Sequence, residues 1–198
     1  MIDEGYIKFQ PHWTQTPALA ENLIAEINHW RQQLYDCGLI GAYPDGIGFG
    51  NISCRYNGSD QFVISGSATG NFPVLDGRHY SLVTKVNVAS NELWCEGPIV
   101  ASSESMSHAA VYRLVPAVQA VVHVHHLGLW EQLLYKVPTT DETATYGSPE
   151  MVYAIETLFA TTPLRKEGLF VMAGHREGIF TFGESLEAAA VKAMDLLK

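Results

Sequence analysis

The chain has 198 residues, of which 47% are hydrophobic and 17% charged, a balance typical of a folded globular protein. Its formal net charge of −9 argues against a nucleic-acid-binding protein, which normally presents a basic face. An anionic small substrate stays possible, because backbone N–H groups can bind a phosphate inside an acidic protein.

The beginning of the chain has no apolar segment typical of a secretory signal, and no run is long enough for a membrane span. The three cysteines, Cys37, Cys54 and Cys95, form no Cys-x-x-Cys pair, which is typical of reduced thiols. We therefore expect a soluble cytoplasmic protein that binds neither nucleic acid nor a membrane.

The first half of the chain predicts one helix followed by strands. Residues 16–38 carry apolar side chains at helical spacing, with Thr16 and Pro17 as the helix start and Gly38 as its end. Asn57-Gly58 predicts a hairpin. Strands are predicted over residues 52–56, 61–65, 80–88 and 92–95.

The second half alternates helices with apolar strands. A short amphipathic helix leads into a strand that ends near His126, and Ser148 with Pro149 opens a further helix. Other helices are predicted over residues 128–136 and from about residue 184 to the end, and strands over residues 168–173 and 178–182. Because no linker or repeat interrupts the chain, we expect one α/β domain over residues 1–198 with a mixed sheet.

Two histidines on one predicted strand are candidates for a metal site. His123 and His125 emerge on the same face, roughly 6–7 Å apart along the strand. Imidazole suits zinc and other late first-row metals. His175, at the end of an apolar strand, is the candidate third ligand, and three ligands leave a position open for a substrate. The alternative for a lone histidine is a hydrogen-bonded core or turn residue.

Three polar residues, Ser102, Ser103 and Glu104, stand where the amphipathic helix begins. Free N–H groups at a helix start favour anions, and a carboxylate within reach of a substrate can move a proton. The same residues would also serve as a simple helix cap that needs no ligand. His108, one helical turn further on, either orients that carboxylate or packs, and His126 faces away from the other histidines.

In chain order these stretches resemble the class II aldolase/adducin family, whose members include fuculose-phosphate aldolase and the ribulose-phosphate 4-epimerases. The resemblance covers residues 16–195. It rests on Gly50-Asn51-Ile52-Ser53-x-Arg55, Ser102-Ser103-Glu104-x-x-x-His108, Val122-His123-x-His125 and Gly174-His175.

The resemblance implies a single three-layer α/β/α domain with a central mixed, largely antiparallel sheet. It implies that Zn²⁺ or another divalent transition metal is held by His123, His125 and His175, with Glu104 as the catalytic acid/base. The residues implied to bind the substrate phosphate are Asn51, Thr69, Gly70, Ser102 and Ser103.

The implied activity is a zinc-dependent lyase reaction, the aldol cleavage of a small phosphorylated ketose through a metal-stabilised enediolate, in a homotetramer. The alternatives are a sugar-phosphate epimerase or dehydratase on the same scaffold, or a non-catalytic adducin-like interaction domain. Two stretches depart from the family pattern. Residues 174–178 (GHREG) are two residues longer than the family's Asn-His-Gly, and the loop over residues 65–70 lacks a proline.

Overall fold

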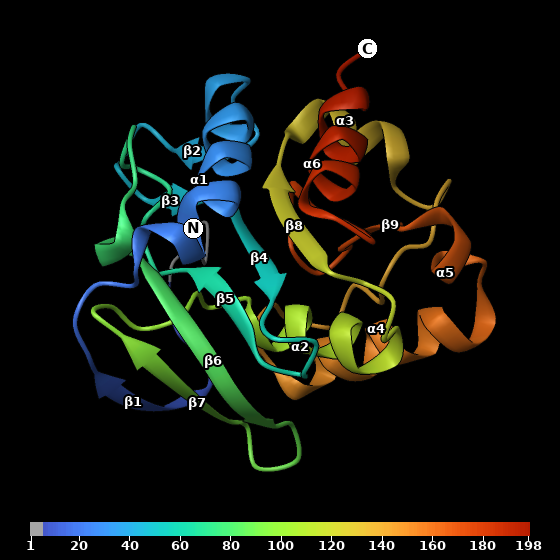
Figure 1. The fold of residues 1–198 in the computed structure, drawn as a ribbon. Helices are drawn as coiled ribbons and strands as arrows, with labels where there is room; N and C mark the ends of the chain where they lie inside the picture. Colours follow the sequence, from blue (N-terminus) through green and yellow to red (C-terminus); the bar gives the residue numbers. More distant parts are fainter. Residues whose placement is uncertain (1–5) are drawn as a thin grey trace.

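An eight-stranded sheet forms the centre of the computed structural model, which describes residues 6–198 (Figure 1). Its strand order is β1-β7-β6-β5-β4-β8-β10-β9. β1 runs parallel to β7, and all other neighbouring pairs are antiparallel. The bounds of these strands are β1 Gln10–Gln15, β4 Asn51–Arg55, β5 Phe62–Ser65, β6 Tyr80–Asn87, β7 Glu92–Gly97, β8 Ala120–His125, β9 Leu169–Val171 and β10 Gly178–Gly183. A small separate pair joins β2 Gly41–Ala42 to β3 Gly48–Phe49.

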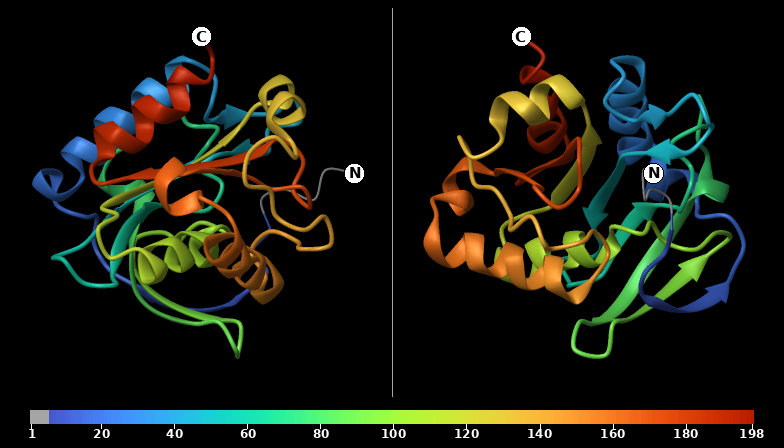
Figure 2. Two further views of the ribbon diagram at one scale, coloured as in Figure 1. Left: turned by 90° about the vertical axis from the view of Figure 1, so that its right-hand side faces the viewer. Right: turned by 180° about the vertical axis from the view of Figure 1, so that it is seen from behind.

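Helices cover both faces of the large sheet (Figure 2). One face carries α1, α3 and α6, whose apolar side chains pack with Ile52 and Val122 of the sheet. The other face carries α2, α4 and α5, which pack with Phe62 and Phe180. The helix bounds are α1 Glu21–Asp36, α2 Ser105–Leu114, α3 Leu127–Leu133, α4 Pro149–Thr161, α5 Leu164–Glu167 and α6 Leu186–Asp195. The three-layer α/β/α arrangement with a mixed, largely antiparallel sheet is therefore confirmed.

The start of the first helix was predicted wrongly. α1 begins at Glu21, and its N-cap residue Ala20 makes no side-chain cap. Thr16 instead donates its backbone N–H to Gly97 O at 3.2 Å, so it continues the edge of the sheet rather than capping a helix. The predicted end is correct, because Gly38 follows the C-cap residue with a φ of +77° that suits glycine.

Strand β1 has no counterpart among the predicted elements. It is an edge strand that contains Pro11, and its side chains are almost all exposed, so it lacks the alternation by which a half-buried strand is found. Its backbone pairs in parallel with β7, a distant segment of the chain that no local pattern indicates as its partner. None of the helices between residues 6 and 198 is both long enough and apolar enough to cross a bilayer.

Other local predictions are confirmed. Asn57 and Gly58 both have positive φ and join β4 to β5 as a hairpin. Ser148 caps α4 by accepting the N–H of Met151, with proline at the first helical position. The three cysteines are free.

Candidate metal centre

Two adjoining strands and one turn bring the three candidate histidines together. His123 and His125 lie on β8, and the antiparallel β10 places Phe180 opposite His123 and Gly178 opposite His125. His175 lies in the turn that joins β9 to β10. A side chain at Gly178 would come within 2.6 Å of the His175 ring and 3.2 Å of the His123 ring. Because Gly178 has no side chain, the two rings have room to approach each other.

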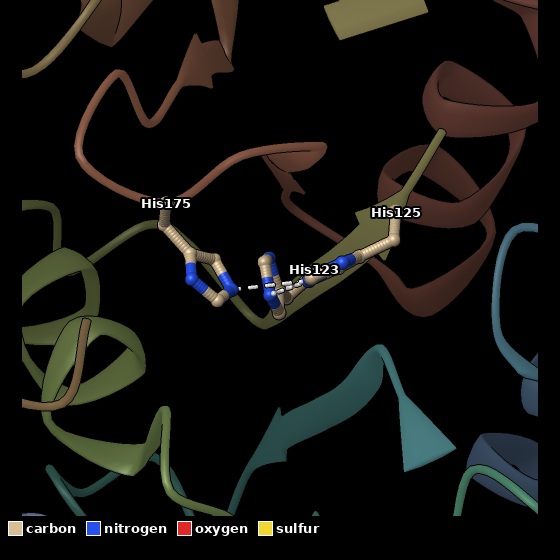
Figure 3. Close-up of side chains that lie close together, drawn as sticks. All are labelled: His123, His125 and His175. Carbon is tan, nitrogen blue, oxygen red and sulfur yellow. Dashed lines mark hydrogen bonds between the residues drawn. The ribbon is translucent and has the colours of Figure 1, made fainter. Parts of the chain in front are cut away.

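The inner nitrogens of the three rings face one another (Figure 3). His125 Nε2 lies 2.9 Å from His123 Nε2 and 3.1 Å from His175 Nε2. Nitrogens that share one tetrahedral zinc are roughly 3.3 Å apart, as Zn–N bonds of about 2.0–2.1 Å require. All three side chains are buried, so the donor set and its spacing fit a divalent transition metal.

Burial keeps the imidazoles of His123 and His125 neutral. It lowers the pKa of His123 and His125 well below the usual value, and the neighbouring histidines lower both further. A neutral imidazole offers a lone pair, which is the form that binds a metal. The outer nitrogen Nδ1 of His123 faces the carbonyl of Ile179 at 3.3 Å, and because a carbonyl only accepts, this contact assigns the proton to Nδ1 and leaves Nε2 bare.

Glu104 lies beside this cluster at the start of α2. Its carboxylate is buried, with Oε1 4.0 Å from His175 Nε2 and Oε2 accepting the Ser107 hydroxyl at 2.7 Å. Ser107 therefore orients the carboxylate. Of the two roles that the sequence allowed for His108, packing is the one observed: its Nδ1 lies 2.7 Å from Ser53 Oγ, in the core.

A small pocket adjoins the histidines and is lined by seven of the nine candidate residues. These are Asn51, Thr69, Gly70, Ser102, Ser103, Glu104 and His123. Asn51 and His123 meet because they are paired across β4 and β8. Among the described residues, Oδ1 of the buried Asn51 has no hydrogen-bond partner, as expected for a group that a ligand satisfies.

The serine hydroxyls and the loop serve partly to shape this pocket. Ser102 Oγ accepts the N–H of Glu104 at 3.3 Å, a turn contact that precedes α2. It is not a helix cap, since the N-cap residue of α2 is Glu104, which makes no side-chain cap. Thr69 donates its hydroxyl to Gly66 O at 2.8 Å, within the loop. At Gly70 any side chain would lie 2.5 Å from Gly41 O, so only glycine fits there.

Arg31 of α1 contacts the loop that contains Thr69 and Gly70. It was not singled out from the sequence. Its guanidinium is buried and donates to the carbonyls of Thr69 at 3.1 Å and Phe72 at 2.7 Å. Burial lowers its pKa, and the coulombic influence of Tyr80 raises it in part. A buried positive charge that contacts the pocket loop favours an anion bound in the pocket.

Three further residues lie next to the histidine cluster or follow it directly in the chain. His126 caps α3 by accepting the N–H of Leu129, so it lies outside the cluster as expected. Tyr146 is buried, and its ring centroid lies 4.6 Å from that of His175. Tyr43, in the β2–β3 connection, has its hydroxyl 2.9 Å from His125 Nδ1, and no sequence signal indicated it.

The buried His108 predicts an acid-sensitive contribution to stability. Burial lowers its pKa from 6.5 to about 3, so the unfolded chain binds the proton first as the pH falls. The stability present above pH 6.5 is lost progressively down to about pH 3, and by pH 5.5 the loss is about 1.4 kcal/mol. Urea unfolding of the metal-free protein at pH 7.5 and 5.5, compared with His108→Leu, measures this. From pH 7.5 to pH 5.5 the free energy of unfolding of wild type should fall by about 1.4 kcal/mol more than that of His108→Leu. If the free energies of the two proteins differed by the same amount at both pH values, the prediction would be wrong.

The structure combines a buried three-histidine cluster, a neighbouring carboxylate and a small polar pocket. This combination is typical of a metal-dependent enzyme. The chain belongs to the class II aldolase and adducin family, since residues 44–197 match the family model "Class II Aldolase and Adducin N-terminal domain". No curated protein sequence matches the chain significantly.

Solved structures of similar fold include several sugar-phosphate enzymes. L-fuculose-1-phosphate aldolase from Thermus thermophilus is 25% identical, with a TM-score of 0.63 over 89% of this chain and 90% of that one. A sugar-phosphate aldolase from Thermotoga maritima is 17% identical, with a TM-score of 0.66 over 89% and 90%. YgbL from Klebsiella pneumoniae, whose activity is described only as aldolase, epimerase or decarboxylase, is 20% identical, with a TM-score of 0.65 over 89% and 85%.

Proposed function

We propose that this protein is a zinc-dependent lyase that cleaves a small phosphorylated ketose by a retro-aldol reaction. The observation that carries the proposal is the convergence of three buried imidazole nitrogens next to the buried carboxylate of Glu104. Membership of the class II aldolase family and the similarity to a fuculose-phosphate aldolase support the reaction class.

His123, His125 and His175 would hold the metal through Nε2. When bound, such an ion is a Lewis acid that polarises a substrate carbonyl and stabilises the enediolate. Glu104, held by Ser107, would transfer the proton at the carbon that gains or loses the carbon–carbon bond. The cleaved bond would leave its electron pair on the ketone fragment. The adjacent hydroxyl would lose one proton as it becomes the aldehyde and the ketone carbon would gain one, so the reaction releases no net proton.

Asn51, Thr69, Gly70, Ser102 and Ser103 would bind the substrate phosphate. Their support is that they line one pocket beside His123. The charge of Arg31, which contacts the loop, adds to the attraction for an anion. We further propose that residues 1–198 form one class II aldolase-like domain and that the protein is a cytoplasmic homotetramer.

Metal analysis of the purified full chain tests the metal part of the proposal. About one zinc-like ion per chain is expected after supply of the metal and removal of the excess. A wild-type protein that binds no zinc, cobalt or manganese under these conditions would contradict it.

A product assay tests the reaction. Ketose 1-phosphates and the corresponding free ketoses are incubated with the metal-loaded protein, and aldehyde and three-carbon ketone products are measured by mass spectrometry. Cleavage of the phosphorylated sugars alone supports the proposal, whereas cleavage of free ketoses with equal efficiency would contradict phosphate binding. An epimer of unchanged mass or a product lighter by one water would point to the second candidate, an epimerase or dehydratase; an epimerase is one of the activities named for YgbL.

A further inference from the structure

Three segments far apart in the chain meet at the outer nitrogen of His125. The Tyr43 hydroxyl, from the β2–β3 connection, lies 2.9 Å from His125 Nδ1. The same hydroxyl donates to Glu177 Oε2 at 2.9 Å, in the turn before β10. Tyr43 also packs against Phe49, whose ring in turn stacks on that of His125. The result is a continuous chain from a carboxylate through a hydroxyl to an imidazole.

The direction of these hydrogen bonds decides which nitrogen of His125 carries the proton. An ionised carboxylate only accepts, so it draws the single hydroxyl proton of Tyr43 toward Glu177. The phenolic oxygen then accepts from His125, which requires Nδ1–H. In this tautomer Nε2 has a lone pair that points at His123 and His175.

We propose that Tyr43 and Glu177 are positioning residues that hold the His125 ring and its tautomer ready to bind the metal. The proposal rests on the proposed metal-dependent function. Groups that fix the far nitrogen of a metal-binding histidine commonly set the affinity of the site.

The backbone of Glu177 supports a role for its side chain. Its φ of +74° is in the left-handed region, where a residue with a side chain is strained and glycine is not. Its carbonyl accepts the N–H of His126 at 3.2 Å, which ties the turn to the end of β8. A glycine would meet the backbone requirement without strain but would provide no acceptor for Tyr43. Glu177 also lies in the stretch by which residues 174–178 exceed the family's Asn-His-Gly.

Two variants test whether Tyr43 and Glu177 position the metal ligand or only stabilise the fold. Tyr43→Phe removes the hydroxyl, and Glu177→Gly removes the carboxylate while relieving the backbone strain. Zinc affinity is measured by competition with a chromophoric chelator, and the geometry of the site by the d–d absorption of bound Co²⁺. We expect a 10- to 100-fold loss of zinc affinity in each variant and an altered cobalt spectrum.

The stability of the metal-free forms provides the contrast. Metal-free Glu177→Gly is expected to melt no lower than wild type, because relief of the strain offsets the lost contact. The two side chains act in series on the same ring nitrogen. The zinc affinity of the double variant should therefore lie within about twofold of the affinity of the weaker single variant. Glu177→Gln, which keeps an acceptor oxygen, should lose less affinity than Glu177→Gly.

Matched controls are Tyr153→Phe, which removes an exposed hydroxyl on α4, and Asn57→Gly, which relieves a positive φ far from the site. Both should bind zinc like wild type. Unchanged affinity in Tyr43→Phe and Glu177→Gly would overturn the inference and leave the proposed function standing. Failure of the wild type itself to bind zinc or cobalt would overturn both.

Discussion

Glu104→Gln is expected to lower the kcat for cleavage roughly 10²- to 10⁴-fold, the usual contribution of a general acid or base. Glutamine has the same shape and can still accept the Ser107 hydroxyl, which now orients Oε2 at 2.7 Å. It cannot take up or release a proton. The measurement is steady-state cleavage of the sugar phosphate that the wild type cleaves best, with the metal content of each preparation determined in parallel.

The matched control for Glu104→Gln is Glu96→Gln, which makes the same change at an exposed position of β7. It should retain the kcat of wild type. The three histidines should keep the metal in Glu104→Gln, so activity and metal content should separate. A kcat within tenfold of wild type would rule out Glu104 as the acid/base, and a parallel loss of metal would indicate that Glu104 acts chiefly as a ligand.

His125→Ala is expected to abolish metal binding together with the stabilisation that the metal provides. His125 is the central ligand candidate, since its Nε2 lies within 3.1 Å of both other inner nitrogens. Zinc at 100 times its dissociation constant stabilises a folded protein by about 2.7 kcal/mol. For a chain of this size that raises the melting temperature of wild type by roughly 5–10 °C.

Thermal unfolding with zinc and with a chelator measures this shift. His125→Ala should melt at the same temperature under both conditions. His29→Ala, which removes an exposed histidine of α1, should respond to zinc like wild type. An equal zinc response in His125→Ala would show that the metal binds elsewhere.

Local sequence patterns predicted the elements that carry the candidate site. The two-residue spacing of His123 and His125 put them on one face of β8 because side chains alternate along a strand. The position of Glu104 at the start of α2 also followed from the chain itself. The same reasoning failed for the start of α1, where Thr16 and Pro17 have the chemistry of a helix start but the backbone is bound to the sheet.

Local patterns could not predict the contacts between distant segments. Arg31 resembled any polar residue of an amphipathic helix, yet its guanidinium is buried beneath the loop that contains Thr69 and Phe72. Tyr43 and Glu177 are 134 residues apart, and only Glu177 lay in a stretch that the sequence singled out, residues 174–178. Their roles depend on how loops pack, and a periodic pattern carries no information about that.

By itself the sequence determined the order of most helices and strands, because turn residues, caps and periodic apolar side chains act between near neighbours. Through the resemblance it also indicated the family to which the chain belongs. Only the tertiary structure decided three features: the contact of Tyr43 with His125, the contact of Arg31 with the pocket loop, and the pairing of the edge strand β1. Those features arise from packing across the sheet, where the interacting groups are close in space and far apart along the chain.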